Sequence, residues 1–208
     1  MEKRSITSED YLKLIDEYTI YNGYTTLTDI SNYLNITRQS AYDEINLLIK
    51  SNIVEKKGKG QYVLTEEGER EANIFLRKHR IAEIILYNCL DMPWNEIDDE
   101  AMGIEHGITE KIEESVYGKY NCSKCPHGNP IPDKNGNVTE PDDIQYKDLQ
   151  NNNKYIVSRI VFENKDILNF LGKYNIIPGK TVEKIDGKLI FDKIIIPEYI
   201  SRAMRYFY

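Results

Sequence analysis

The stretch from His79 to His106 constrains the fold most, because it reads as two successive helices that carry metal-binding side chains. A break at Asp91-Met92-Pro93 separates the helices, since proline cannot continue a helix. Residues three or four positions apart lie on the same helix face, so His79 and Glu83 face one way on the first helix. The second helix is predicted to open near Pro93-Trp94. The candidate ligands on the two helices are His79, Glu83, Asp98, Met102, Glu105 and His106.

A metal site is favoured here over a solvated acidic face with one satisfied histidine. A solvated acidic face with one satisfied histidine would explain any single residue of the set. Two of the three histidines in the chain, however, have carboxylate partners at helical spacing. Imidazole, carboxylate and thioether groups on two antiparallel helices can hold a transition metal through N, O and weak S ligation. Metal binding is therefore the working hypothesis for this stretch.

The totals set wide bounds on the class of protein. A chain of 208 residues suffices for one large domain or for two or three small ones. No apolar run approaches the roughly 20 residues of a membrane helix, and the amino-terminal decapeptide lacks the apolar core of a signal peptide. Three cysteines without a secretory signal are expected to be reduced thiols in the cytoplasm. A net charge of −7 argues against indiscriminate nucleic-acid binding but permits a local basic surface.

The amino-terminal third has the pattern of a helix-turn-helix followed by a hairpin. Apolar residues recur at helical spacing in three segments, and Ser8 is expected to cap the first. Two alternating runs then flank a Gly-Lys-Gly turn and predict a β-hairpin, which in this position is a wing. The predicted elements are helices at 8–21, 27–34 and 38–51, a tight turn at 35–37, and strands at 53–57 and 61–64.

The hairpin gives an otherwise acidic chain a local basic patch. Three lysines in a hairpin are equally consistent with a solvated turn, but beside a helix-turn-helix they favour DNA binding. Arg38 and Gln39 suit bidentate base contacts, the lysines are expected to touch phosphates, and Asp43 is expected to order Arg38 or to avoid DNA. The predicted DNA-binding residues are Thr37, Arg38, Gln39, Tyr42, Asp43, Lys56, Lys57 and Lys59.

A long helix from Thr65 to about Leu90 and a further helix from Thr109 to about Tyr117 flank the candidate metal ligands. Ile104, Ile108 and Ile112 recur every four residues and form an apolar stripe. Core packing would explain such a stripe, but a two-helix unit has little core of its own. We therefore expect a homodimer interface.

The carboxy-terminal half contains a cysteine loop, a polar stretch and short alternating runs. Cys122, Cys125 and His127 could be part of a zinc site, but a closed site needs a fourth ligand and none lies nearby in sequence, so a structural loop is favoured. Residues 133–153 are rich in Asn, Asp and Pro and predict a linker. The runs that follow predict a small β-barrel-like domain with one inserted helix at 164–174 and a hairpin turn at Asp186-Gly187.

In combination, these parts strongly resemble the diphtheria toxin repressor family of metal-dependent transcriptional regulators. The most specific segments of the resemblance are RKHRIAE (77–83), DEAMGIEH (99–106) and CPHGNPIP (125–132). The resemblance implies a mostly α fold with a small β part. Its domains would be a winged helix-turn-helix (1–70), a helical metal-binding and dimerisation domain (71–132), a linker (133–153) and an SH3-like domain (154–208).

The resemblance also implies two cation sites. The activating site would draw on Asp10, Met102, Glu105 and His106. The ancillary site would use His79, Glu83, Asp98, Glu163 and Asp166. Met102 stands where iron regulators usually have cysteine and manganese regulators an acid, Asp98 where histidine is common, and Asp166 where an amide is common. Fe²⁺ is favoured, with Mn²⁺ close behind, and Zn²⁺, Ni²⁺ or Co²⁺ are expected to substitute in vitro.

The expected function is a non-enzymatic, cytoplasmic regulator, acting as a repressor, that binds a palindromic operator as a dimer when loaded with metal. A helical-bundle metalloenzyme is the alternative from another class, but Glu105 and His106 are adjacent and lack the Glu-x-x-His spacing of di-iron bundles. His-Glu-x-x-His is also absent from the sequence. A metal-independent winged-helix regulator is the other alternative.

Overall fold

A computed structural model describes residues 7–121 and 123–208, and its contacts divide the chain into two compact units. The first comprises the chain up to Arg77 together with Pro132–Val138, and the second comprises Lys78–Ile131 with Thr139–Tyr208. Cys122 lies outside the described residues. None of the described helices is long and apolar enough to cross a membrane.

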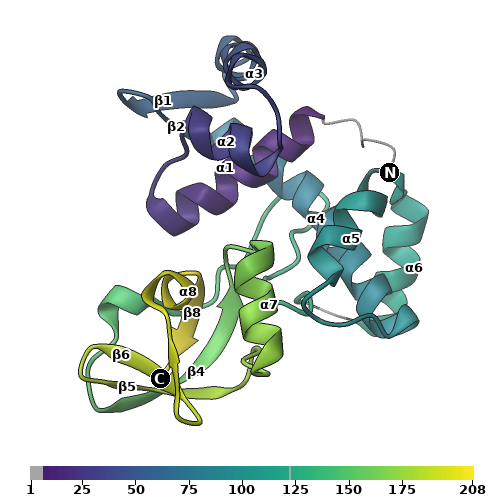
Figure 1. Cartoon of the computed structure of the whole chain (residues 1–208). Helices are drawn as coiled ribbons and strands as arrows, with labels where there is room; N and C mark the ends of the chain where they lie inside the picture. The colour runs from purple at the N-terminus through teal and green to yellow at the C-terminus, as the bar shows by residue number, and fades with distance from the viewer. Residues whose placement is uncertain (1–6, 122) are drawn as a thin grey trace. The chain divides into compact units, whose positions relative to one another are not determined.

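The first unit is a winged helix-turn-helix, as predicted (Figure 1). Threonines precede its three helices and accept or exchange hydrogen bonds with the first turn. The N-cap of the first helix is Thr7 and not Ser8, because Asp10 at the third helical position completes a capping box with Thr7. Buried aliphatic residues such as Ile15, Ile30 and Ile45 hold the helices together. The elements are α1 (Ser8–Asn22), α2 (Leu27–Tyr33), α3 (Arg38–Lys50), β1 (Val54–Gly58) and β2 (Gln61–Leu64).

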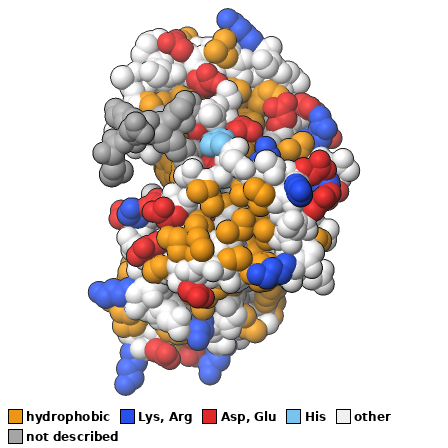
Figure 2. Space-filling model, turned by 90° about the vertical axis from the view of Figure 1, so that its right-hand side faces the viewer, with side chains coloured by type: hydrophobic (Ala, Val, Ile, Leu, Met, Phe, Trp, Pro, Cys, Tyr) orange, Lys and Arg blue, Asp and Glu red, His pale blue; other side chains and the backbone are white. Residues whose placement is uncertain are grey.

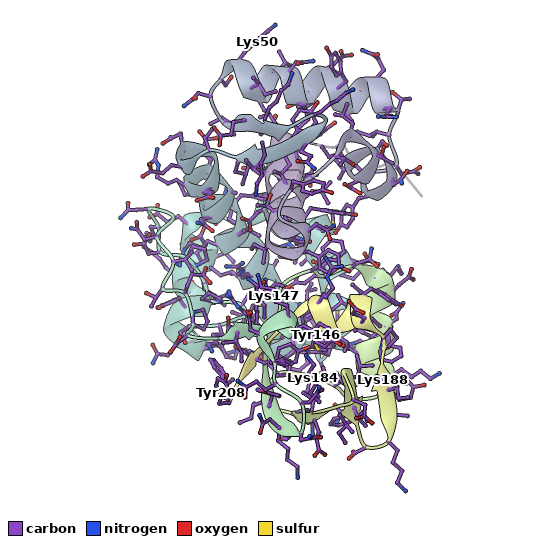
Figure 3. All side chains as sticks on the ribbon, turned by 90° about the vertical axis from the view of Figure 1, so that its left-hand side faces the viewer. Lys50, Tyr146, Lys147, Lys184, Lys188 and Tyr208 are labelled. Atoms are coloured by element: carbon purple, nitrogen blue, oxygen red, sulfur yellow. The ribbon has the colours of Figure 1, made fainter. Side chains whose placement is uncertain are left out.

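The wing is the antiparallel pair β1–β2, and its lysines lie on the exposed side. Lys56 is opposite Tyr62, and the register shifts between Lys56 and Gly58. Thr25, which precedes α2, pairs with the backbone of Tyr62 and anchors the hairpin to the helices. Lys50 projects from the end of α3 (Figure 3).

α4 (Glu66–Leu90) begins in the first unit and continues into the second, where α5 (Ile97–Ile104) and α6 (Glu110–Tyr120) follow. α5 is the second helix of the metal-binding stretch, and it starts at Ile97, later than the predicted start near Pro93-Trp94. A 3-10 turn, Glu105–Gly107, replaces the end of this helix. Because the chain leaves the helix between α5 and α6, the isoleucine stripe is not continuous. Ile108 is buried, whereas Ile104 and Ile112 are 40% and 37% exposed. Figure 2 faces the side of α5 and α6 and shows hydrophobic side chains gathered on it.

The carboxy-terminal part is a six-stranded antiparallel sheet in the order β3-β8-β4-β5-β6-β7, which confirms the SH3-like expectation. α7 follows β4 along the chain (Figure 1), and α8 packs near β6 and β8. The elements are β3 (Ile144–Gln145), β4 (Asn153–Ile160), α7 (Lys165–Lys173), β5 (Thr181–Ile185), β6 (Lys188–Phe191), β7 (Ile194–Ile196), α8 (Glu198–Arg202) and β8 (Met204–Phe207).

Local sequence explains the β5–β6 hairpin but not the edge of the sheet. Asp186 and Gly187 both have positive φ, 48° and 76°, as a tight two-residue hairpin turn requires. The stretch 133–153, predicted as a linker, contributes the edge strand β3 and a 3-10 turn at Tyr146–Asp148. In that turn the Tyr146 ring lies 4.6 Å from the Lys184 ammonium (Figure 3).

Candidate metal centre

Six ionisable side chains are buried together in the second unit, which is costly unless they are paired or bind a cation. Three of the carboxylates and one imidazole come from the helices and the 3-10 turn. The other two members come from the loop after Cys125 and from the residue before the N-cap of α7. The members are His79 on α4, Glu83 on α4, Asp98 on α5, Glu105 in the 3-10 turn, His127 in the loop and Glu163 before α7, each no more than 5% exposed.

The two nitrogens of His79 face different carboxylates. Nδ1 lies 2.5 Å from Oε2 of Glu105. Nε2 lies 3.1 Å from Asp98 Oδ1, 3.7 Å from Glu83 Oε1 and 3.8 Å from Glu163 Oε2. An ionised carboxylate accepts only, so Nδ1–H is placed to donate to Glu105. Nε2 faces three further anionic groups, among which a cation could take the place of a proton. Metal-binding histidines have this arrangement, with one nitrogen held by a carboxylate and the other offered to the ion.

Carboxylates and a tryptophan hold the ring of His127 in place. Nδ1 lies 2.6 Å from Glu83 Oε1 and 3.5 Å from Glu163 Oε1, and Nε2 lies 3.1 Å from the Trp94 carbonyl oxygen. The Trp94 ring packs edge-on against it at 4.7 Å, and its Nε1–H donates to Pro126 O. Burial lowers the pKa of His127, but the carboxylates of Glu83 and Glu163 outweigh it and hold that pKa well above its usual value.

The loop that carries His127 is pinned to β4 by its neighbours. Asn129 Nδ2 donates to Ile160 O and to Glu163 Oε1, both at 2.7 Å, and Ile160 N–H donates to His127 O at 2.9 Å. Gly128 has φ +90°, and a Cβ there would lie 2.4 Å from Ser158 O. A side chain at this position would therefore push the loop off the strand.

The structure brings together four of the five predicted ancillary residues. Ligand atoms of His79, Glu83, Asp98 and Glu163 all lie within 4.8 Å of one another. Asp166 does not join them: it is exposed in the first turn of α7, where its N–H donates to Asn164 Oδ1. The donor set of one imidazole and three carboxylates suits a hard or borderline divalent ion such as Mn²⁺ or Fe²⁺.

A second group shares two of these carboxylates. Ligand atoms of Cys125, His127, Glu83 and Glu163 also lie within 4.8 Å of one another. Burial, together with Glu83 and Glu163, raises the pKa of the Cys125 thiol well above its usual value. Sequence reasoning placed this loop outside the metal centre, because both shared carboxylates are distant in the chain. The sequence signal for these two residues is the Cys-x-His spacing of Cys125 and His127, which places a thiol and an imidazole two positions apart.

Of the residues predicted for the activating site, Met102, Glu105 and His106 belong to the second unit and Asp10 belongs to the first. Glu105 is buried, and His106 Nε2 lies 3.7 Å from Glu105 Oε1 with 30% of its side chain exposed. Met102 is half-buried on α5. In the first unit, Asp10 is 3% exposed, and its Oδ2 accepts from the N–H and hydroxyl of Thr7 at 2.7 and 3.0 Å.

The predicted DNA-binding residues all lie on exposed parts of α3 and the wing. Asp43 accepts from Gln39 Nε2 at 2.8 Å. It therefore orders Gln39, whereas the sequence predicts that it orders Arg38 or avoids DNA. Tyr42 is 47% exposed, and Lys57 Nζ donates to Gly23 O at 2.9 Å. The Thr37 hydroxyl caps α3 by accepting from Ser40 N–H at 3.0 Å.

Comparisons with known proteins agree with this architecture. A family model described as the iron dependent repressor, metal binding and dimerisation domain, matches residues 65–133. The crystal structure of IdeR from T. acidophilum is 48% identical, covers 98% of each chain and superimposes with a TM-score of 0.93. The structure of the manganese regulator SloR is 22% identical, covers 98% of this chain and 99% of that one, and has a TM-score of 0.83, which shows the shared fold.

Curated relatives match a shorter part of the chain. The iron-dependent repressor IdeR of Mycobacterium tuberculosis is 31% identical over 132 residues, which are 61% of this chain and 55% of that protein. The chain thus spans about half the length of the curated relatives it matches.

Proposed function

The chain belongs to the iron-dependent, diphtheria toxin repressor family, and on that premise we propose that it is a metal-dependent DNA-binding transcriptional regulator that acts as a homodimer. One observation carries the proposal. The same chain combines an exposed recognition helix and lysine-bearing wing with a buried cluster of carboxylates and imidazoles. The first suits a DNA surface, and the second suits a divalent cation. Family members are transcriptional regulators, which argues against the metalloenzyme alternative.

The ancillary ion would be held by His79, Glu83, Asp98 and Glu163. Asp166 remains a proposed fifth ligand, which would have to turn inward from its exposed position. When bound, the ion supplies positive charge and fixed coordination to carboxylates from α4, α5 and the start of α7. Fe²⁺ or Mn²⁺ suits the predominantly oxygen donors, and Zn²⁺, Ni²⁺ or Co²⁺ would substitute in vitro.

The activating ion would be held by Met102, Glu105 and His106 together with Asp10. The neutral thioether of Met102 favours Fe²⁺ over Mn²⁺. Support for Asp10 comes from the family resemblance and from its carboxylate, which already holds the start of α1 through Thr7. Drawing that carboxylate to an ion would therefore act directly on the first turn of the DNA-binding domain.

The link between His79 and Glu105 supports coupling between the two ions. The Nδ1–H of His79 donates to Glu105, so one ligand of the ancillary set orients one ligand of the activating set. An ion on His79 Nε2 would fix the imidazole ring and, through Nδ1–H, the orientation of the Glu105 carboxylate.

On the DNA side, the recognition helices of a dimer would read two half-sites of a palindromic operator, about 34–36 Å apart. Arg38 and Gln39 are proposed to contact bases, and Lys56, Lys57 and Lys59 to contact phosphates. The bond from Gln39 to Asp43 fixes the Gln39 amide before DNA arrives. Repression would follow when the bound dimer covers a promoter.

The test is anaerobic fluorescence anisotropy with palindromic DNA taken from upstream of the gene, at fixed salt, titrating Fe²⁺, Mn²⁺ and Zn²⁺. Asp10→Asn should weaken metal-dependent binding by about 5–150-fold, the usual range of allosteric coupling. Thr7→Ala is the matched control, because it removes one hydrogen bond to Asp10 while leaving the carboxylate. Binding that ignores both chelator and Asp10→Asn would leave a metal-independent regulator, and the proposal would fail.

A further inference from the structure

A groove in the first unit gathers acidic, hydroxyl and apolar side chains that belong to neither proposed metal site. The groove lies between the start of α1 and the helix α3, and its volume is about 680 Å³. Its lining includes Tyr11, Ile36, Asp43, Glu44 and Leu47. We propose that this groove binds an organic cation, namely an aliphatic amine with two ammonium groups. The inference goes beyond the proposed function, and the binding itself requires neither a metal ion nor DNA.

The groove is negatively charged, because two adjacent carboxylates of α3 line it and no lysine or arginine is among the described residues of its lining. Ser8 Oγ donates to Glu44 Oε1 at 2.7 Å, and Gln39 Nε2 donates to Asp43 Oδ1 at 2.8 Å. The second oxygen of each carboxylate accepts no hydrogen bond from the described part of the chain. Each of these two oxygens is therefore available to accept from one ammonium group.

The hydroxyl of Tyr11 distinguishes this groove from an ordinary solvated acidic surface. Tyr11 is only 5% exposed and lines the groove, yet its hydroxyl makes no hydrogen bond with the described residues. Leaving a buried polar group unsatisfied is costly. Burial, and after it the negative charge of Glu44, raises the pKa of Tyr11, so the hydroxyl stays protonated. An ammonium group in the groove would give the hydroxyl oxygen the donor that it lacks.

The apolar part of the lining favours an organic cation over a hydrated metal ion. Leu47, which is 55% exposed, and the half-buried Ile36 line the same groove as the carboxylates. Methylene groups between two ammonium groups would cover this apolar surface, as the stems of lysine side chains do. A hydrated ion would leave the same surface in water. The described lining also contains no imidazole or thiolate that would select a transition metal.

The groove adjoins the recognition surface of α3, because Asp43 both lines the groove and holds the Gln39 amide. Carboxylates beside a helix that approaches DNA face phosphates of the same sign, and like charges brought together weaken an interface. An amine held by Asp43 and Glu44 would neutralise both carboxylates. We therefore expect amine binding and DNA binding to strengthen each other. This consequence, unlike the binding site itself, rests on the proposed function.

Isothermal titration calorimetry of the full chain with 1,4-diaminobutane, in chelator and without DNA, tests the site. We expect saturable binding of one amine per chain. Glu44→Gln keeps the shape and an acceptor for Ser8 but removes the charge, so it should weaken binding about 10–150-fold, as the loss of a hydrogen bond to a charged group does. Glu55→Gln is the matched control, because it removes an equal charge from the exposed side of β1, outside the groove, and should leave the affinity unchanged.

Tyr11→Phe separates a role in ligand binding from a role in folding. Removing a hydroxyl that has no hydrogen bond should not lower Tm, yet it should weaken amine binding about 2–10-fold. The absence of saturable heat at millimolar amine, or an equal loss of affinity in Glu44→Gln and Glu55→Gln, would overturn the proposal, because the amine would then respond only to net charge. Mg²⁺ that displaces the diamine with equal affinity would overturn the assignment to an organic cation.

The operator assay then measures the coupling to DNA. At fixed salt, 1,4-diaminobutane should tighten operator binding more in the unmodified chain than in Glu44→Gln. An equal change in both chains would show that the amine acts on the DNA alone and would refute the coupling. Because the calorimetry contains no DNA, it decides the binding site separately from the proposed function.

Discussion

Gly128→Ala should destabilise the second unit far more than a glycine substitution with the same backbone conformation elsewhere. Gly128 and Gly179 both have φ +90°. Alanine in a left-handed conformation costs about 1–2 kcal/mol at either position. A Cβ at Gly179 meets nothing within 4 Å, whereas one at Gly128 lies 2.4 Å from Ser158 O and 2.9 Å from Arg159 Cα. Gly179→Ala is therefore the matched control for the steric part of the effect.

The extra cost at Gly128 follows from the hydrogen bonds that the loop must give up. Backbone atoms cannot rotate away, so the loop would move off β4. That movement would break the bond from Ile160 N–H to His127 O and the two bonds of Asn129. Neutral hydrogen bonds contribute about 0.5–1.5 kcal/mol each, and those to charged groups about 1.5–3 kcal/mol. Together with the backbone cost, the loss is about 4–8 kcal/mol, against about 1–2 kcal/mol for Gly179→Ala.

Thermal unfolding in excess chelator measures this without a contribution from metal. A loss of 1 kcal/mol lowers Tm by roughly 2–4 °C in a chain of this size. We expect Gly179→Ala to lower Tm by about 2–8 °C and Gly128→Ala to lower it by at least twice as much. Equal shifts for the two variants would show that the close approach to Ser158 does not hold the loop, and the account of the metal centre built on it would be refuted.

Three further results are expected. Lys56→Gln with Lys59→Gln should reduce the salt dependence of operator binding, by about 0.9 in the log–log slope for each phosphate that the protein no longer neutralises, and an unchanged slope would remove the wing from the interface. Burial raises the pKa of Tyr206 well above its usual value of 10, so the contribution of this residue to stability is full below pH 10. Above pH 10 the tyrosine of the unfolded chain ionises first, which lowers the free energy of unfolding. In urea unfolding, stability should therefore fall less steeply above pH 10 in Tyr206→Phe than in the unmodified chain. Iodoacetamide should label the exposed Cys89 of the folded, chelated protein and reach the buried Cys125 only after unfolding, as mass spectrometry of labelled peptides would show.

Sequence periodicity determined the winged helix and the pairing of His79 with Glu83. Helical spacing is a local property, so α1, α2 and α3 appear within one residue of their predicted ends. The β5–β6 turn is equally local, because Asp186-Gly187 tolerates two positive φ angles. Spacing was less informative for Ile104 to Ile112, since a 3-10 turn and a connection interrupt the helix there.

Only the tertiary structure decided which distant residues complete the metal centre. Glu163 and Asp166 are three apart, yet the N-cap of α7 lies between them, so one side chain turns inward and the other faces solvent. The CPHGN loop was predicted to be structural because no fourth ligand lies near it in sequence. Folding brings two carboxylates to this loop from distant parts of the chain. Glu83 lies 44 residues before His127, and Glu163 lies 34 residues after Asn129. Long-range packing against β4 sets those distances, and no local pattern in the chain encodes it.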